Sequence, residues 1–242
     1  MSKKDIKLAL NSGVDLKPTA TPGICRAVVI GADKRFDLTW DRFLRLHRTA
    51  EAIKQHVETS QSILDVGGFD GALALFLPQY DIDVLDPITT GGTGLSITTV
   101  PYDAVVSIDA IEHVAPEDRQ SFLEQLCKAA RHSCFINFSG RHTTAAQQLI
   151  FALTNNPLVK EHVEWQLPDV DYVKQHLESS GFIVETKGHS SLSQWISQYL
   201  LQSVAPDLAA KTNRYLLEYH LEEPTGTHLY DLVIGNRVIF QD

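Results

Sequence analysis

The sequence predicts an α/β fold with a doubly wound, mostly parallel sheet. Short runs of apolar residues, typical of buried strands, alternate with segments whose apolar residues recur at helical spacing. The chain has 242 residues, 43% of them hydrophobic, which is enough for one domain with a complete core. Right-handed crossovers would then place helices on both faces of the sheet.

The N-terminal part, residues 1–58, is expected to be a leader followed by a helical cap. Prolines and a glycine interrupt residues 1–23, which are therefore expected to be irregular. An apolar run predicts a strand at 24–30. Apolar residues at helical spacing predict a helix at 37–57, with Asp37 as its cap. The three arginines of this helix are expected on a solvated face: Arg42, Arg45 and Arg48.

Residues 59–242 are expected to form the main domain. Strands are predicted at 63–66, 82–86, 104–108, 134–138, 182–185 and 229–239. Helices are predicted at 72–77, 116–130, 169–179 and within 191–220. A helical insertion at about 186–225 would separate the last two strands, which are expected to pair antiparallel at the sheet edge.

Charge and composition exclude several classes of protein. Residues 1–54 hold 11 Lys and Arg against 6 Asp and Glu, whereas the remainder holds 10 against 24. An acidic main body argues against binding of DNA or tRNA. No apolar run approaches the ~18 residues of a membrane-spanning helix, and no signal-peptide core is found. The cysteines form no CxxC pair, so reduced thiols and a cytoplasmic location are expected.

The most specific local signal is the segment 65–71, Asp-Val-Gly-Gly-Phe-Asp-Gly, between an expected strand and an expected helix. Glycines there allow backbone to approach a ligand, and a helix N-terminus offers free N–H groups. Asp86 ends the next strand, where a carboxylate can accept both hydroxyl protons of a ribose. These features predict a site for a nucleoside-containing cofactor at the carboxyl ends of the strands.

The spacing of this segment does not match a dinucleotide site. The fingerprint G-x-G-x-x-G is missing, because Phe69 stands two residues after Gly67. Asp65 and Asp70 would also repel a pyrophosphate, whereas they suit a ligand with a cationic amine. S-adenosylmethionine carries a ribose, an ammonium and a sulfonium, and no phosphate.

Residues 63–87 resemble the first two motifs of class I S-adenosylmethionine-dependent methyltransferases. The common turn of that family is D-x-G-x-G-x-G. This sequence keeps Asp65, Gly67 and Gly71 and has Phe69 at the position of the middle glycine.

Residues 102–113, Tyr-Asp-Ala-Val-Val-Ser-Ile-Asp-Ala-Ile-Glu-His, resemble the fourth strand of that family and the turn after it. The resemblance covers about residues 60–140 and implies a Rossmann-like methyltransferase fold with S-adenosylmethionine as cofactor. It assigns cofactor binding to Asp65, Gly67, Gly68, Gly71, Asp86 and Asp109. Residues 90–96 contain no carboxylate for the adenine amine, so the adenine contacts are left open.

Within this resemblance, Asp65 would line the methionine end of the cofactor and Asp86 would hold the ribose. Asp109 would lie near the methionine moiety or the acceptor. Structural interpretations are also open, since Asp65 and Asp109 could cap the following turns and Asp86 could form a turn before Pro87.

Two histidines are candidates for catalysis. His113 could act as a general base, because an unperturbed pKa of ~6.5 suits proton transfer near neutrality. His142 follows the strand expected at 134–138 and could face the same cleft. No metal site is expected, since Glu112 and His113 are adjacent and cannot share one helix face.

The predicted function is S-adenosylmethionine-dependent methyl transfer to an oxygen of a small-molecule or glycan acceptor such as a sugar. Two alternatives are left open. One is a non-catalytic binding or scaffold protein on a methyltransferase fold, and the other is an NAD-dependent oxidoreductase, which the missing fingerprint disfavours.

Overall fold

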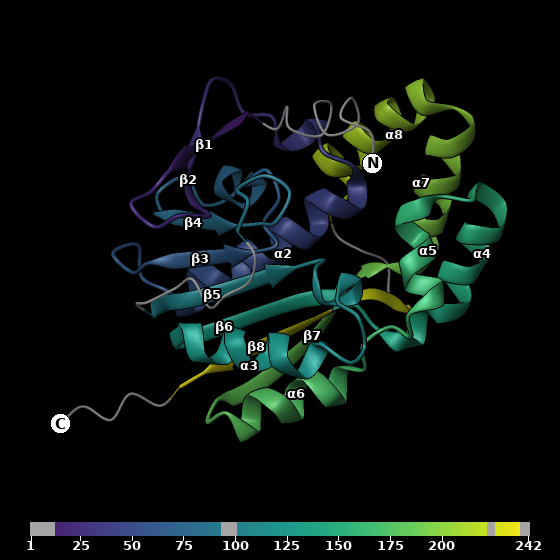
Figure 1. Ribbon diagram of the computed structural model, residues 1–242. Coiled ribbons are helices and arrows are strands. Elements are labelled where there is room, and N and C mark those ends of the chain that lie inside the picture. The colour runs from purple at the N-terminus through teal and green to yellow at the C-terminus, as the bar shows by residue number, and fades with distance from the viewer. Residues whose placement is uncertain (1–12, 93–100, 222–225, 238–242) are drawn as a thin grey trace.

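The computed structural model describes residues 13–92, 101–221 and 226–237, and their eight strands form one mixed sheet in the order β1-β2-β4-β3-β5-β6-β8-β7 (Figure 1). The strands are β1 (Val14–Pro18), β2 (Ile24–Val29), β3 (Ile63–Val66), β4 (Ile82–Leu85), β5 (Tyr102–Ile108), β6 (Ala130–Ser139), β7 (Ile183–Ser191) and β8 (His228–Asn236). The α-helices are α2 (Trp40–His56), α3 (Arg119–Ala129), α4 (Thr144–Thr154), α5 (Pro157–Glu164), α6 (Val170–Ser179), α7 (Leu192–Val204) and α8 (Pro206–Tyr219). Short 3₁₀ helices are η1 (Arg35–Asp37), η2 (Ala72–Leu75), η4 (Ile111–His113) and η5 (Arg141–Thr143).

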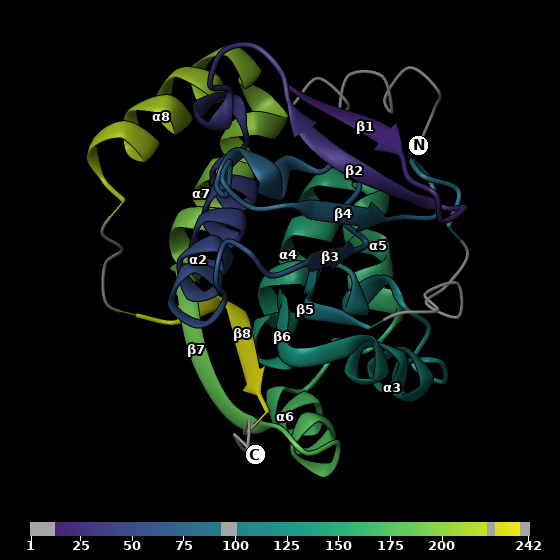
Figure 2. The same ribbon diagram turned by 90° about the vertical axis from the view of Figure 1, so that its left-hand side faces the viewer.

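The centre of the sheet is parallel and its two sides are not. Strands β4, β3, β5 and β6 pair in parallel, whereas β1–β2, β2–β4, β6–β8 and β7–β8 pair antiparallel. Four of these seven pairings are antiparallel, so the prediction of a doubly wound, mostly parallel sheet is right only for the centre. Figure 2 shows the strands fanning from the β1–β2 hairpin to β7 and β8.

Helices cover both faces of the sheet, as the sequence predicts. Helix α2 packs on one face, against β6, β7 and β8, while α3 and α6 pack together on the other. The two faces have separate hydrophobic cores. Leu44 and Ile53 belong to the first core, and Leu126 and Leu177 to the second. The apolar spacing of each helix is the reason that it buries one stripe against the sheet.

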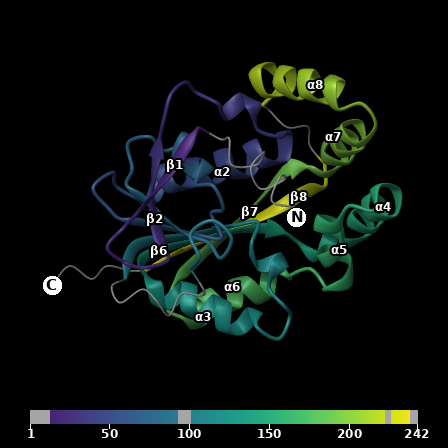
Figure 3. The ribbon, with the colours of Figure 1, turned by 45° about the horizontal axis from the view of Figure 1, so that its top comes forward.

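A group of helices gathers beyond the ends of β5 and β6. Helix α4 contacts α5 and α7, and α7 contacts α8 (Figure 1). Helix α2 lies between the β1–β2 hairpin and this group (Figure 3). No helix in the described ranges is both long and apolar enough to span a lipid bilayer.

The N-terminal expectations need two corrections. Part of the segment expected to be irregular forms β1, because Val14 and Leu16 alternate with polar residues and pair with β2. Residues 14–29 therefore extend the same sheet that β3–β8 form. Asp37 does not cap α2, since Thr39 precedes its first residue and Asp37 ends η1.

Three further differences concern the later chain. The helix expected at 72–77 is only the 3₁₀ turn η2, because Pro78 stops it within one turn of its start. Strand β7 continues to Ser191, so the helical insertion begins at Leu192 instead of about 186. Helices α4 and α5 were not predicted. The last two strands pair antiparallel as predicted, with β8 inside the sheet and β7 at its edge.

Candidate cofactor and acceptor site

The sheet reverses its winding between β3 and β5. The chain passes from β3 to β4 on one side and then to β5 on the other, which makes the gap between β3 and β5 a topological switch point. In open α/β sheets, ligands bind at the carboxyl ends of the strands at such a point. The strand ends meet closely here, since a Cβ on Gly67 would lie 2.8 Å from the Cβ of Ala110.

Residues 65–71 are named here the glycine turn. They comprise the last two residues of β3 and the turn that follows, which has an unusual backbone conformation. Gly67, Phe69 and Gly71 have φ values of 77°, 48° and 74°. These are the three glycine positions of the D-x-G-x-G-x-G pattern, so the turn has the left-handed conformation at each of them, including the one occupied by Phe69. A side chain in this region is strained, which makes Phe69 the departure from the pattern that costs stability.

Asp65 is the first residue of the glycine turn and is only 1% exposed. Its Oδ2 lies so close to Gly68 that a Cβ there would approach it to 2.4 Å. Its Oδ1 has no hydrogen-bond donor among the described residues. Burial, and then the negative charges of Asp86 and Asp70, raise the pKa of Asp65 to about 7, against a smaller opposing effect of Arg42.

The other two carboxylates of this region have protein partners. Asp70 pairs with Arg42 of α2 and accepts the N–H of Ala72 at 3.2 Å, while its Oδ2 has no donor in the described chain. The Asp86 carboxylate accepts the N–H groups of Phe69, Ile88 and Thr89 at 2.8–3.3 Å, while the Thr89 hydroxyl donates to the carbonyl of Phe69. Oδ1 accepts two of these bonds and Oδ2 accepts one, so Asp86 holds the glycine turn against the end of β4 while Oδ2 keeps acceptor capacity.

A second group of charged residues lies at the ends of β5 and β6 and is named here the polar cluster: Arg45, Asp109, Glu112, His113, Glu161 and His162. Asp109 has φ 57° and donates its N–H to the carbonyl of Asn137. Its carboxylate lies 2.8 Å from the Arg45 guanidinium. Arg45 also contacts Asp41 and the hydroxyl of the buried Tyr230. Burial raises the pKa of Asp109, but Arg45, His113 and His162 together outweigh this effect and the pKa is lowered.

Glu112 and two histidines complete the polar cluster. Glu112 is fully buried and accepts the N–H of Ser139 at 3.0 Å, and burial followed by the charge of Asp109 raises its pKa to about 7. His113 Nδ1 lies 2.7 Å from Glu161, and His113 Nε2 lies 3.4 Å from His162 Nε2.

The two rings differ in protonation. Burial opposes the charged form of His113, but Asp109, Glu112 and Glu161 outweigh it and raise its pKa. Burial lowers the pKa of His162 to about 4. His113 is therefore the ring that holds the proton between them.

The comparisons with known proteins agree with this geometry. No protein-family model and no curated protein sequence matches the chain. Among solved structures, magnesium protoporphyrin IX methyltransferase from Synechocystis with bound S-adenosylhomocysteine superposes with a TM-score of 0.53 at 10% identity. That match covers 97% of this chain and 94% of the other. The plantazolicin methyltransferase BpumL with S-adenosylhomocysteine gives 0.52 at 14% identity, over 82% of this chain and 85% of the other.

The chain has the class I methyltransferase fold. At these identities the likeness establishes the fold and not the acceptor. An O-methyltransferase family protein from Burkholderia thailandensis gives a TM-score of 0.49 at 10% identity over 82% of this chain, which spans 58% of that protein.

The predicted cofactor residues of the methyltransferase fold come together in space. Gly67, Gly68 and Asp65 lie at the end of β3, with Asp86 bonded to Phe69 beside them. Gly71 packs against the N-terminal hairpin, since a Cβ there would lie 3.0 Å from both Leu16 and Ala27. It therefore allows close approach of the hairpin and not of a helix. The N-terminal donors expected of a helix at 72–77 are not provided by the short η2.

The arginines of α2 were placed wrongly by the sequence. Arg42 and Arg45 are 22% and 15% exposed and pair with Asp70 and Asp109, instead of lying on a solvated face. The position of these arginines among the apolar residues of the helix is the signal that could have predicted their buried ion pairs. Glu161 and His162 were missed because α5 was not predicted. Residues 93–96 of the expected adenine region lie outside the described residues.

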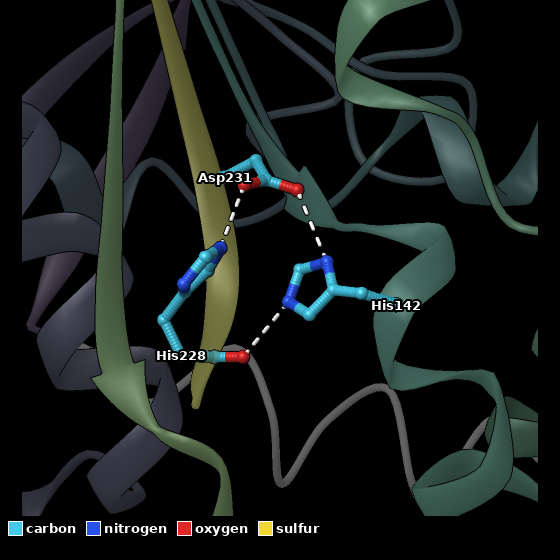
Figure 4. A group of neighbouring side chains, drawn as sticks. All are labelled: His142, His228 and Asp231. Carbon is cyan, nitrogen blue, oxygen red and sulfur yellow. Dashed lines mark hydrogen bonds and ion pairs between the residues drawn. The ribbon is translucent and has the colours of Figure 1, made fainter. Parts of the chain in front are cut away.

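The second predicted catalytic residue, His142, lies in η5 after β6. Its ring contacts His228 and Asp231 of β8 (Figure 4). His113 instead faces Glu161 and His162 of α5. The structure thus gives the two histidines different partners.

Proposed function

We propose that this chain is an S-adenosylmethionine-dependent methyltransferase that methylates an oxygen of a small molecule or sugar. The observation that carries the proposal is the buried Asp65 carboxylate, whose Oδ1 lacks a donor within the described chain, at the switch point of a methyltransferase fold. A buried acceptor without a donor costs about 1–3 kcal/mol. A ligand ammonium would supply the donor and a compensating charge.

The residues present fit this cofactor better than a phosphate-bearing one. Asp65 and Asp70 each have an oxygen without a donor among the residues described, and both repel phosphate. Gly67 and Gly68 let Ala110 and Asp65 lie directly against the turn, where a Cβ would clash with them. In this proposal Asp65, Gly67 and Gly68 hold the methionine end, and Asp109 lies beside it at the end of β5.

The cofactor supplies, when bound, a methyl group on a positively charged sulfur. The protein's part is to position the acceptor and to exclude water. Arg45 fixes the Asp109 carboxylate at the strand end, and the buried Glu112, with a pKa of about 7, is about half ionised beside it at neutral pH.

We propose that His113 is the general base that removes the proton from the acceptor hydroxyl. Its Nδ1 is oriented by Glu161, as in a carboxylate–histidine pair, and its Nε2 faces a neutral His162. Because the pKa of His113 is raised, the proposal expects activity to increase with pH above 6.5 as the ring loses its proton. The catalytic role of His142 stays a prediction.

A small acceptor is supported by a cavity of about 210 Å³ between η1, α2, α7 and α8. Trp40, Trp195 and Tyr199 line it, together with Asp41, which contacts Arg45 of the polar cluster. A cavity of this size suits a small ligand or one end of a larger one. Aromatic walls beside a carboxylate suit the body and a hydroxyl of a sugar or aromatic acceptor.

A non-catalytic binding protein on the same fold is the second candidate. It is favoured by Asp86, whose carboxylate already accepts three backbone N–H groups of its own chain, and by the reduction of the following helix to η2. In that case the glycine turn is a structural element that Asp86 stabilises.

The deciding experiment is calorimetric titration of the purified chain with S-adenosylhomocysteine, with NADH titrated in parallel. The proposal expects micromolar binding of the first ligand alone, weakened at least tenfold by Asp65→Asn. The exposed Asp171→Asn on α6 is the matched control and should bind as the parent does.

Two results would overturn the proposal. One is the absence of S-adenosylhomocysteine binding, and the other is equal binding by the Asp65→Asn and Asp171→Asn variants. Binding without methyl transfer to any sugar, phenol or carboxylate acceptor would instead establish the second candidate. Saturable NADH binding would support the oxidoreductase alternative.

A further inference from the structure

A cluster of potential metal ligands lies at the junction of η5 and β8, where side chains from two distant segments of the chain point toward one another (Figure 4). His142 comes from η5. His228 and Asp231 lie in the first four residues of β8. One ligand atom from each lies within 4.8 Å of the other two. Asp231 is 6% exposed, and its Oδ2 has no hydrogen-bond donor in the described ranges.

The hydrogen bonds of His142 fix which nitrogen is free. Its Nε2 lies 2.9 Å from the backbone carbonyl of His228, and a carbonyl can only accept, so Nε2 carries a proton. The neutral ring then has its lone pair on Nδ1. A metal-bound histidine typically donates its other N–H to a backbone carbonyl or carboxylate in this way.

The distance from His142 Nδ1 to Asp231 Oδ2 fits a metal ion shared by the two atoms better than a hydrogen bond between them. The two atoms are 3.6 Å apart, which is too far for a hydrogen bond. A zinc ion with bonds of about 2.0–2.2 Å at tetrahedral angles holds its ligand atoms about 3.4 Å apart. Two acceptor atoms that face each other at this separation suit a shared metal ion.

Two glycines provide the space for these side chains. A Cβ on Gly140 would lie 2.1 Å from Asp231 Oδ2 and 2.8 Å from His142 Nδ1. A Cβ on Gly188, which is directly opposite Asp231 in β7, would lie 2.6 Å from the ring of His228. Neither glycine has a positive φ, so the requirement at both positions is space and not backbone conformation.

We propose that His142, His228 and Asp231 form a binding site for a divalent transition metal of the zinc class. Nδ1 of His142, Nε2 of His228 and an Asp231 oxygen are the ligands, and His228 moves its proton to Nδ1 on a side chain that is 40% exposed. Two imidazoles and one carboxylate favour zinc, copper, iron or nickel over magnesium or calcium. Three protein ligands leave one tetrahedral position open for water or another ligand.

Such a site would join two parts of the chain at the end of the helical insertion. His142 precedes α4, and His228 follows α8 at the start of β8. The metal would hold these two ends together, so its binding should stabilise the fold whether or not the chain binds S-adenosylmethionine.

The test uses the full chain, stripped with a chelator and titrated calorimetrically with Zn²⁺ in the absence of S-adenosylmethionine. The proposal expects one equivalent of Zn²⁺ per chain and no binding of Mg²⁺. His142→Gln and Asp231→Asn should each lower the Zn²⁺ affinity at least tenfold, and Co²⁺ should give the visible spectrum of a tetrahedral site in the parent but not in these two variants.

The matched control is His176→Gln on α6, which removes a histidine outside the cluster and should bind Zn²⁺ as the parent does. His142→Gln changes a partly exposed ring, so it tests the site even if Asp231→Asn does not fold. Equal Zn²⁺ affinity of the parent and His142→Gln, or no Zn²⁺ binding by the parent, would overturn the proposal. Neither result bears on S-adenosylhomocysteine binding, which is measured separately.

Discussion

The glycine turn and the polar cluster occupy neighbouring strand ends but handle buried charge in opposite ways. In the glycine turn, Asp65 and Asp70 crowd together with Arg42 as the nearby cation, and each retains an oxygen without a donor in the described chain. In the polar cluster, Asp109 has Arg45 at 2.8 Å and its pKa is lowered.

The difference teaches which region depends on a ligand. A buried carboxylate without enough donors is stabilised either by taking a proton or by a bound cation, and a pKa of about 7 means that Asp65 takes a proton below that pH. Asp109 needs neither, because the protein itself supplies its cation. We therefore expect a cationic ligand to change the protonation of the glycine turn and leave the polar cluster as it is.

The largest loss of stability is expected from Arg45→Met, which removes the cation of the polar cluster. The substitution leaves Asp109, whose side chain is 22% exposed, without its cation; removing one partner of a fully buried ion pair costs about 3–5 kcal/mol, so we expect a loss of about 3 kcal/mol for this partly buried pair. Urea denaturation measures the loss in the free energy of unfolding. Arg131→Met is the control, since its pair with Asp103 is half exposed and contributes about 1 kcal/mol or less. Similar losses for both variants would contradict the comparison.

The next largest effect is a pH dependence of the free energy of unfolding that Asp65 causes. Because its pKa is about 7 when folded and about 3.9 when unfolded, the native state binds more protons between these values. Stability contributed by this group is thus lost as the pH rises from 4 to 7. Relative to the parent, Asp65→Asn should gain on the order of 3 kcal/mol over this range.

Urea denaturation at several pH values measures this difference, with Asp171→Asn as the control that should follow the parent. A constant difference between Asp65→Asn and the parent from pH 4 to 7 would show that Asp65 is charged throughout.

A smaller effect is expected from Asp86→Ala, which separates the two roles of this residue. Loss of its bonds to Phe69, Ile88 and Thr89 should reduce the free energy of unfolding by about 1–2 kcal/mol. If Asp86 also holds a ribose, S-adenosylhomocysteine binding should weaken further, by roughly 1–3 kcal/mol. Denaturation and calorimetry on the same variant distinguish these results, since unchanged affinity would leave Asp86 with the structural role alone.

The smallest effect concerns the strained residue of the glycine turn. At φ 48°, Phe69→Gly should be more stable than Phe69→Ala by about 1 kcal/mol, because both variants lose the ring and only glycine avoids the left-handed penalty. At the exposed strand position 186 the order should reverse, with Thr186→Ala more stable than Thr186→Gly. The same order at both positions would mean that the turn is not strained at Phe69.

The sequence by itself determined the parallel centre of the sheet and the glycine turn. Both depend on residues close together in the chain, since apolar runs give the strands and residues 65–71 give the turn. The hairpin strand β1 had a local signal in Val14 and Leu16 that its prolines and glycines obscured. The helix after the turn failed because Pro78 limits it, which is also a local effect.

Only the tertiary structure decided which charges face one another. Arg45 of α2 and the α5 residues Glu161 and His162 reach the polar cluster from elements more than 100 residues apart, and His142 meets His228 and Asp231 across 86 residues or more. The periodicity of a segment fixes which residues lie inward, but the pairing of inward charges depends on how the elements pack. Burial in that packing sets the pKa values of Asp65, Glu112 and His162, because desolvation acts on a side chain only once other elements cover it.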